Sequence, residues 1–241
     1  MCIRDREGFV NLEQLEGNID ERTLLVSIQH ANQEIGTIQD IKEIGSICKE
    51  KDVLFHVDAA QSFTKVPIDV EKMNIDLLSI SAHKIHGPKG VGALYVREGV
   101  KLKPLIEGGY NEFGLRSGTE NIPGIVGFAK AVEIVDESQI EHMRRLRDHL
   151  IEGLLEIPDS RLNGPRGEKR LCNNVNITFK YVEGESVLLH LDMRGIIVTT
   201  GSACFSKTLE PSHVILALGL KHEDAHGSVR FSLSKYNTLE E

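Results

Sequence analysis

Short apolar runs alternate with amphipathic stretches through the first half of the chain. Residues 23–29, 53–57 and 77–80 are rich in Leu, Val and Ile, and runs of this length are typical of buried strands. Between the first two runs, Asp40 opens a stretch whose apolar positions recur with helical spacing. The order of strand, helix and strand favours an α/β fold with a mostly parallel sheet.

The second half of the chain has a different pattern. Residues 122–157 have a helical pattern, and residues 159–170 are rich in Gly, Pro and charge. The elements expected after them are strands over residues 175–179, 196–198 and 228–234 and a helix over residues 185–193. We therefore expect two domains, a large one over residues 1–136 and a smaller α+β domain over residues 137–241.

Polar side chains follow two of the apolar runs, 53–57 and 77–80. They are Asp58 and Gln61 after the first run and Ser81, His83 and Lys84 after the second. Because ligands of an open α/β sheet bind outside the carboxyl ends of its strands, these side chains are expected to converge. A lysine in a partly apolar crevice can form a Schiff base with an aldehyde cofactor, and an aspartate can pair with a protonated pyridine nitrogen.

The same residues carry a resemblance to a known family. HVDAAQ at residues 56–61, followed by SISAHKIHGPKGVGALYV at residues 79–96, resembles the pyridoxal-phosphate-dependent cysteine desulfurases, in the class V aminotransferase group. The resemblance covers nearly the whole chain. It implies a fold-type I enzyme with pyridoxal 5'-phosphate as its cofactor, here with an incomplete large-domain sheet.

The resemblance assigns cofactor-site roles to residues near these strands. Lys84 would carry the cofactor, Asp58 would pair with its pyridine nitrogen, and His83 would lie against its phosphate. Gln61 and Ser81 complete the expected cofactor-binding set on this sheet.

Two further cofactor-binding residues are expected in loops. Asn32, in the turn HANQEIGT at residues 30–37, would lie near the cofactor's phenolic oxygen and the substrate carboxylate. Thr119, in RSGTEN at residues 116–121, would bond the phosphate of the other subunit of a homodimer. The plainer alternatives are that Asn32 is a turn residue bonding its own backbone and that Thr119 caps a helix.

Two residues of the smaller domain resemble the family's sulfur-transfer and substrate-binding groups. TTGSACFSKTLEPSH at residues 199–213 is similar to the long cysteine loop of members that hand sulfur to an iron-sulfur scaffold protein. The resemblance makes Cys204 the sulfur-accepting nucleophile, with a chance loop cysteine as the alternative. Arg230 would hold the substrate carboxylate by a bidentate fork, with a surface arginine on an edge strand as the alternative.

Composition narrows the choice of partners. The 241 residues are 40% hydrophobic and carry a formal net charge of -8, which argues against nucleic acid or a membrane surface as a partner. No apolar run is long enough to span a bilayer, so we expect a cytoplasmic protein. The four cysteines show neither CxxC pairing nor a regular spacing with histidines, and no metal site is expected.

These observations predict a cysteine desulfurase that converts L-cysteine to L-alanine and leaves the sulfur on Cys204 as a persulfide. The sulfur would serve iron-sulfur cluster assembly, through a scaffold protein, or another sulfur acceptor. The alternatives are a selenocysteine lyase or related lyase of the same fold, and a non-catalytic fragment that acts as an assembly partner.

The resemblance also predicts what the chain lacks. Family members have a Gly/Thr-rich turn that cradles the phosphate, and a histidine that stacks on the pyridine ring, ahead of the region matched here. A terminal helix follows that region in the family. We therefore expect a chain truncated at both ends, which binds the cofactor poorly on its own.

Overall fold

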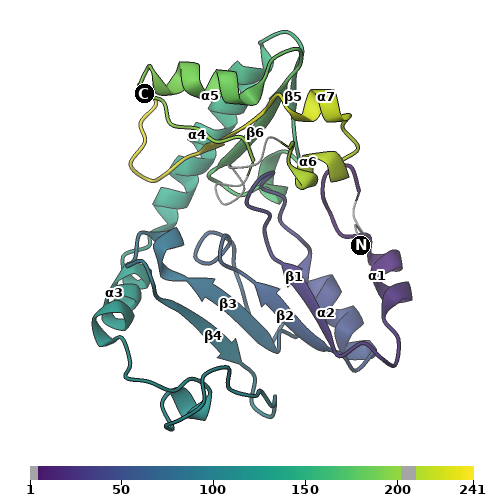
Figure 1. Cartoon of the computed structure of the whole chain (residues 1–241), viewed down its shortest axis with the longest axis vertical. Helices are drawn as coiled ribbons and strands as arrows, with labels where there is room; N and C mark the ends of the chain where they lie inside the picture. The colour runs from purple at the N-terminus through teal and green to yellow at the C-terminus, as the bar shows by residue number, and fades with distance from the viewer. Residues whose placement is uncertain (1–4, 202–209) are drawn as a thin grey trace. The chain divides into compact units, whose positions relative to one another are not determined.

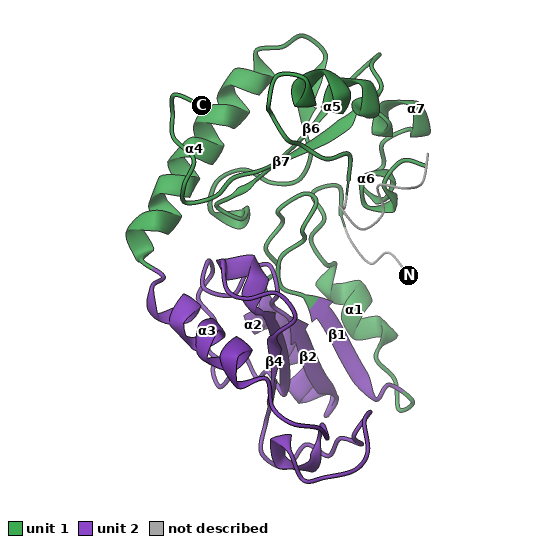
Figure 2. Ribbon diagram, turned by 60° about the vertical axis from the view of Figure 1, so that its left-hand side comes forward, with its two compact units in different colours: residues 1–22, 29–40, 136–241 green, residues 23–28, 41–135 purple. Residues whose placement is uncertain are grey.

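The computed structural model describes residues 5–201 and 210–241 (Figure 1). The chain forms two compact units, shown in different colours in Figure 2. The first unit contains residues 1–22, 29–40 and 136–241, and the second contains residues 23–28 and 41–135. The expected functional domains, divided between residues 136 and 137, stay a prediction.

The second unit is built on a four-stranded sheet with the strand order β1-β2-β3-β4 (Figure 1). The strands are β1 Leu25–Gln29, β2 Leu54–Asp58, β3 Leu77–Ser81 and β4 Gly92–Val96. β2 and β3 pair in parallel, with Asp58 opposite Ser79, whereas β4 runs antiparallel to β3. The three apolar runs are therefore strands, and the expected α/β architecture is confirmed.

Helices pack on this sheet with the apolar side chains whose helical spacing is visible in the sequence. Helix α2, Ile41–Glu50, buries Ile41, Ile44 and Cys48 and contacts β2. The other helices of the unit are the 3-10 helices η1 Ala82–Ile85 and η2 Glu112–Gly114 and the α-helix α3 Ile122–Glu133. Phe128 and Ala131 of α3 form a core cluster with the buried residues of η1, so α3 fixes the position of η1.

The first unit contains a three-stranded antiparallel sheet with the order β5-β6-β7. Its strands are β5 Ser160–Leu162, β6 Asn174–Phe179 and β7 Ser228–Ser232. Its helices are α1 Leu12–Asn18, α4 Glu137–Leu155, α5 Gly184–Asp192, α6 His213–Ala217 and α7 His222–Ala225, with the 3-10 helix η3 Gly167–Lys169. Ile151 of α4 packs against Val175 and Ile177 of β6, which places the core of this unit between α4 and the sheet.

The strand expected over residues 196–198 is wrong. Those residues form no strand, and pairing with β7 begins only at Thr199, whose backbone exchanges hydrogen bonds with Arg230 in an isolated bridge. Ile197 is 86% exposed, so the apolar run there does not enter the core. An apolar run alone cannot show whether its backbone pairs with another strand.

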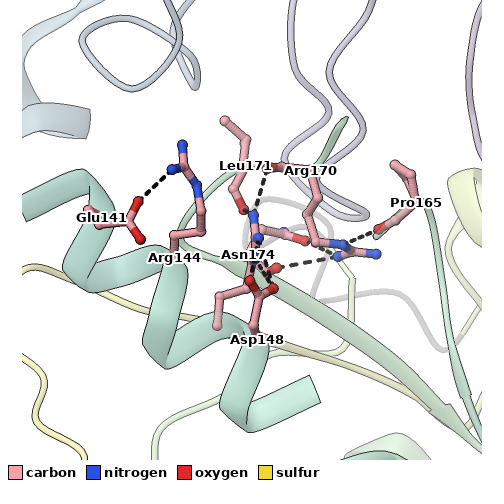
Figure 3. A network of polar contacts seen from close by, with 8 residues as sticks. Glu141, Arg144, Asp148, Pro165, Arg170, Leu171 and Asn174 are labelled. Atoms are coloured by element: carbon pink, nitrogen blue, oxygen red, sulfur yellow. Dashed lines mark hydrogen bonds and ion pairs between the residues drawn. The ribbon is translucent and has the colours of Figure 1, made fainter. Parts of the chain in front are cut away.

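Two arginines are buried, Arg147 on α4 and Arg170 after η3, and both donate hydrogen bonds to backbone carbonyls. Arg147 donates from Nη1 to the carbonyl oxygens of Arg170 at 2.8 Å and Leu171 at 3.2 Å. Arg170 donates from Nε to the carbonyl oxygen of Pro165 at 2.6 Å and from Nη1 to Oδ1 of Asn174 at 2.8 Å (Figure 3). Burial, and then the charge of Arg147, lower the pKa of Arg170 to about 9, so Arg170 stays charged at neutral pH.

Replacing Arg147 with alanine should destabilise the protein strongly. The substitution removes a buried guanidinium and leaves the carbonyl oxygen of Arg170 without its donor, so the free energy of unfolding should fall by about 3 kcal/mol. Arg144→Ala on the same helix is the matched control, because Arg144 makes only an exposed ion pair with Glu141. That control should cost less than about 0.5 kcal/mol in urea unfolding. Equal losses in the two variants would contradict the assignment of Arg147 as a structural anchor.

His30 should make the fold sensitive to acid. It directly follows β1, it is 3% exposed, and burial lowers its pKa from 6.5 to about 4. Between these values the unfolded chain binds more protons than the native state, so stability is lost as the pH falls from about 6.5 to 4. The loss between pH 7 and 4.5 should be smaller in His30→Gln by about 2 kcal/mol, measured by urea unfolding. The exposed His149→Gln is the control and should follow the wild-type curve.

Candidate functional site

The parallel pairing of β2 and β3 brings the expected cofactor-binding residues to one edge of the sheet. β2 ends on Asp58, and β3 ends on Ser81, which leads directly into η1. Since Asp58 lies opposite Ser79 and the two strands run in the same direction, both carboxyl ends lie at this edge. The backbone amide of Ala59 extends the ladder by donating to the carbonyl oxygen of Ser79 at 2.9 Å.

Asp58 and η1 present their functional groups in defined positions. Oδ1 of half-buried Asp58 accepts a hydrogen bond from the backbone amide of Ala60 at 2.9 Å. In η1, Ala82 and Ile85 are buried, whereas His83 and Lys84 are exposed. The helix therefore turns its lysine away from the core that holds it.

Two contacts fix the segments on either side of this edge. The hydroxyl of Ser81 lies 2.8 Å from Nδ1 of His83, which orients the imidazole. The amine of Lys65 donates to the carbonyl oxygens of Gln61 and Lys84, at 3.2 Å each, and so connects the turn after β2 to η1. Lys65 lies outside the strand ends and belongs to no motif, so its contacts could not be predicted from the sequence.

Asn32 and Arg230 lie together in the first unit. Oδ1 of Asn32 accepts hydrogen bonds from the backbone amides of Glu34 at 2.9 Å and Ile35 at 3.0 Å, so the side chain does bond its own turn. Nη1 of Arg230, on β7, donates to the carbonyl oxygen of Gln33 at 3.1 Å. The expected substrate-binding arginine therefore contacts the turn that contains the expected substrate-binding amide.

Glu34 in the same turn was given no role from the sequence. Its side chain is 2% exposed, and the hydroxyl of Ser212 donates a hydrogen bond to its carboxyl Oε2. Its backbone carbonyl accepts hydrogen bonds from the side-chain amides of Asn174 and Asn176, at 3.0 Å each. The HxNxExG spacing contained this residue, but its burial could not be read from the motif.

The two remaining site residues have different outcomes. Thr119 is exposed and precedes α3, and the helix is capped instead by Asn121, whose Oδ1 accepts from the backbone amide of Gly124 at 3.2 Å. The alternative role of Thr119 as a helix cap is therefore wrong, and its role toward a phosphate stays a prediction. Cys204 lies outside the described residues.

Other parts of the described chain offer no competing chemistry. Among residues 5–201 and 210–241, no group of three or more His, Cys, Asp or Glu side chains could hold a metal ion. Within the same residues, every helix is too short or too polar to cross a membrane. Cys48 and Cys172 are buried, and burial raises the pKa of the Cys48 thiol to about 11, which makes it a poor nucleophile.

A pocket in the second unit lies away from these residues. It is lined by Cys48, Asp76 and Arg97 and by residues near the start of β2. The Arg97 guanidinium is already engaged by Glu71, by Asp76 and by backbone carbonyls. This pocket therefore holds a structural arginine and carries no candidate chemistry.

Comparisons with known proteins agree with the resemblance drawn from the residues. "Cysteine desulfurase IscS 1" of Archaeoglobus fulgidus is 57% identical over 240 residues, which cover 98% of this chain and 62% of that protein. "Cysteine desulfurase IscS" of Methanosarcina thermophila is 56% identical over 241 residues, which cover 98% of this chain and 59% of that protein. The chain thus spans about three fifths of the length of these curated relatives.

Solved structures give the same result for the fold. A NifS-like protein superposes with a TM-score of 0.90 at 43% identity, over 99% of this chain and 63% of that one. A structure of SspA in complex with cysteine has a TM-score of 0.82 at 39% identity, over 98% of this chain and 66% of that one. The family model for class-V aminotransferases matches residues 3–241. The chain belongs to the class-V aminotransferase family.

Proposed function

We propose that this protein is a cysteine desulfurase that uses pyridoxal 5'-phosphate. It would convert L-cysteine to L-alanine and keep the sulfur as a persulfide on Cys204. The observation that carries the proposal is the exposed lysine of η1 at the carboxyl ends of two parallel strands, next to the strand that ends on Asp58. A relative named cysteine desulfurase with 57% identity supports this choice of reaction.

The residues at this edge have the chemistry that the cofactor requires. An exposed amine at Lys84 can reach an aldehyde, and the carboxyl group of Asp58 is aligned by the amide of Ala60. The hydroxyl–imidazole pair of Ser81 and His83 offers hydrogen-bonding groups suited to a phosphate. When bound, pyridoxal phosphate would supply an aldehyde for the amine and a ring that withdraws electrons from the substrate's α-carbon.

The chain's own residues would then bind the substrate and move its protons. Arg230 would hold the substrate carboxylate through its guanidinium, with the amide of Asn32 beside it. The Nζ amine of Lys84 would take the α-proton of L-cysteine and later return a proton to carbon. The carboxyl group of Asp58 would pair with the ring nitrogen of the bound cofactor.

Sulfur transfer would be the task of Cys204. Its thiolate would attack the substrate sulfur, so that a new S–S bond forms while the bond from the substrate's β-carbon to sulfur breaks. The carbon keeps the electron pair of the broken bond and takes a proton, which gives L-alanine. The products balance as alanine and an enzyme persulfide, and no separate oxidant is needed.

We also propose that the protein acts as a homodimer. The outer face of α3 is unusually apolar, with Ile122 58%, Ile125 42%, Val126 61% and Val132 39% exposed. These positions recur at helical spacing and begin three residues after Thr119. An apolar helix face of this kind fits a subunit interface, which would present Thr119 to a second copy.

The destination of the sulfur follows from the same proposal. We propose that an iron-sulfur scaffold protein or another sulfur acceptor takes the persulfide sulfur, because residues 199–213 resemble the long cysteine loop of members that hand sulfur to such a scaffold. A cytoplasmic location is proposed because a reactive thiol at Cys204 must stay reduced between cycles. No role in nucleic-acid or membrane binding is proposed.

Lys84→Ala should abolish the covalent link to the cofactor. The relatives are longer than this chain, so two proteins would be tested. One is the chain alone, and the other is the chain fused to the part of the Archaeoglobus fulgidus relative that lies outside the match. The second protein is called the fused enzyme. Borohydride reduction should trap pyridoxal phosphate on the fused enzyme and on Lys89→Ala but not on Lys84→Ala. Alanine formation should fall on the order of a thousandfold in Lys84→Ala. A trapped cofactor in Lys84→Ala would assign the link to another lysine.

Cys204→Ser should separate substrate binding from sulfur transfer. The variant should still bind L-cysteine, seen as a change in cofactor absorbance, but should form persulfide and sulfide at least about a hundredfold more slowly. Cys48→Ala is the matched control, because it removes a buried thiol of high pKa and should keep sulfide release. Sulfide release at the wild-type rate by Cys204→Ser would reject the assignment of Cys204 as the nucleophile.

The substrate preference distinguishes the related lyase. Faster turnover of selenocysteine than of cysteine by the fused enzyme would indicate a selenocysteine lyase.

A further inference from the structure

Lys65 is a half-buried lysine in the turn that follows β2. Its Nζ donates hydrogen bonds to the backbone carbonyl oxygens of Gln61 and Lys84, at 3.2 Å each. Gln61 precedes it by four residues in the same turn, whereas Lys84 follows it by nineteen residues and lies on η1. The ammonium group therefore joins two segments that are separate in sequence, and one of them carries the amine proposed to bind the cofactor.

The turn around Lys65 is held to the sheet by contacts that do not involve its amine. The carbonyl oxygen of Ala59 accepts the backbone amide of Phe63 at 2.8 Å, and the amide of Ala59 donates to the carbonyl oxygen of Ser79 on β3. The ring of Phe63 packs edge to face on that of Phe128, with centroids 6.2 Å apart. The turn is thus a fixed support from which the amine of Lys65 reaches η1.

The backbone of this turn has a conformation that its sequence does not favour. Thr64 has a φ of 66°, in the left-handed region, which is costly for a β-branched side chain. A residue in such a conformation persists only where the surrounding contacts hold it there. Lys65 is the next residue, so the strained backbone at Thr64 sets the direction in which the lysine side chain leaves the turn.

The carbonyl oxygen of Lys84 lies in the last turn of a short helix. This helix, η1, closes where the backbone amides of His86 and Gly87 both donate to the carbonyl oxygen of Ala82. Carbonyl groups in the last turn of a helix have no donor within the helix, and a lysine side chain can supply one. Lys65 supplies this donor to Lys84.

We propose that Lys65 is a positioning residue for the lysine that binds the cofactor. The carbonyl that it holds is bonded to the same Cα as the side chain of Lys84, so fixing the carbonyl restricts where the amine can reach. This inference rests on the proposed function, in which Lys84 forms the link to pyridoxal 5'-phosphate. Lys65 acts through Lys84.

The step that Lys65 would speed is formation of this link. Nζ of Lys84 forms a double bond to the aldehyde carbon, and the aldehyde oxygen leaves as water with the two protons of the amine. An amine held in a reactive orientation has a higher effective concentration at the aldehyde than one that moves freely. Loss of the Lys65 contact should therefore slow the link without changing how the ring and phosphate are bound.

The first test measures η1 in the chain itself, without cofactor. Lys65→Met keeps a long side chain but removes its donor. Hydrogen exchange of the His86 and Gly87 amides, followed by mass spectrometry, should be at least about threefold faster in this variant, because local opening of η1 becomes easier. Lys65→Arg keeps a cationic donor and should exchange within about twofold of wild type. Equal exchange in all three proteins would overturn the proposal.

The second test measures link formation in the fused enzyme. When pyridoxal phosphate is added to the cofactor-free protein, Lys65→Met should form the borohydride-reducible link about tenfold more slowly than wild type. Lys65→Arg should restore the rate to within about threefold. Pyridoxine phosphate has the same ring and phosphate but no aldehyde, so its affinity should change less than about twofold. Lys72→Met is the matched control with an unchanged rate, because the Lys72 amine forms an exposed ion pair with Asp69.

The comparison of the two ligands separates positioning of Lys84 from general support of the site. If Lys65→Met weakens binding of pyridoxine phosphate as much as it slows the link, Lys65 supports the whole site and the positioning role is rejected. An unchanged rate of link formation would reject it as well. If Lys65→Met lacks the circular dichroism of the wild type, Lys65→Gln, whose side chain is one bond shorter than lysine, takes its place with the same expected results.

Failure of this inference can be told from failure of the proposed function. If the wild-type fused enzyme links the cofactor but forms no alanine from L-cysteine, the proposed reaction is wrong, and the rates of link formation still decide the role of Lys65. If the wild type forms alanine and Lys65→Met equals it in hydrogen exchange and in link formation, only the positioning role is rejected.

Discussion

Parallel pairing of β2 with β3 is the constraint on which the candidate cofactor site depends. Two strands that run in the same direction must deliver their carboxyl ends to the same edge, so Asp58 and the segment from Ser81 to Lys84 lie together there. The antiparallel strand β4 begins at this edge on Gly92, where a Cβ would come 2.7 Å from the carbonyl oxygen of Ile80. A side chain at that position would push β4 away from β3 and disturb the strand that leads to the lysine.

The first unit depends on buried polar side chains more than the second unit does. Arg147 and Arg170 bind backbone carbonyls around the connection between η3 and β6, and Asn174 and Asn176 bind the turn at residues 32–37. Each such group loses water on burial, and the cost is offset only when all of the partners are in place. This requirement selects one arrangement of the turn on the sheet. A purely apolar contact would tolerate several arrangements, as hydrophobic packing is not directional.

Local pattern predicted the elements of this fold better than it predicted their contacts. The runs at residues 53–57 and 77–80 are strands. Of the four apolar positions expected on one face of α2, Ile41, Ile44 and Cys48 are buried and Ile47 is half-buried. The run at residues 196–198 has the same local appearance but pairs with no strand of the described residues, and only Thr199 after it bridges to β7. Whether an apolar run pairs depends on residues distant in sequence, which periodicity cannot register.

The residues of the candidate site also differ in whether local sequence pattern could predict them. Strand-end residues such as Asp58 and Lys84 could be found because the end of a strand is visible in the sequence. The contact of Glu34 with Ser212 spans 178 positions, and that of Asn176 with the Glu34 carbonyl spans 142. No local rule relates residues so far apart, and a glutamate in a polar turn is ordinarily expected to be exposed. The motifs at residues 30–37 and 199–213 contain Glu34 and Ser212 but do not indicate what these side chains contact.

Helix α3 links the proposed dimer to the proposed chemistry. Its inner face, through Phe128 and Ala131, packs on the buried residues of η1, and its outer face exposes Ile125 and Val126. In the proposed homodimer a second subunit covers the outer face, and the helix is then held from both sides. Because a close-packed interior has low compressibility and transmits strain, restricting α3 would also restrict η1 and the lysine it presents. Dimerisation would thus stabilise the geometry of Lys84 without any contact to the lysine itself.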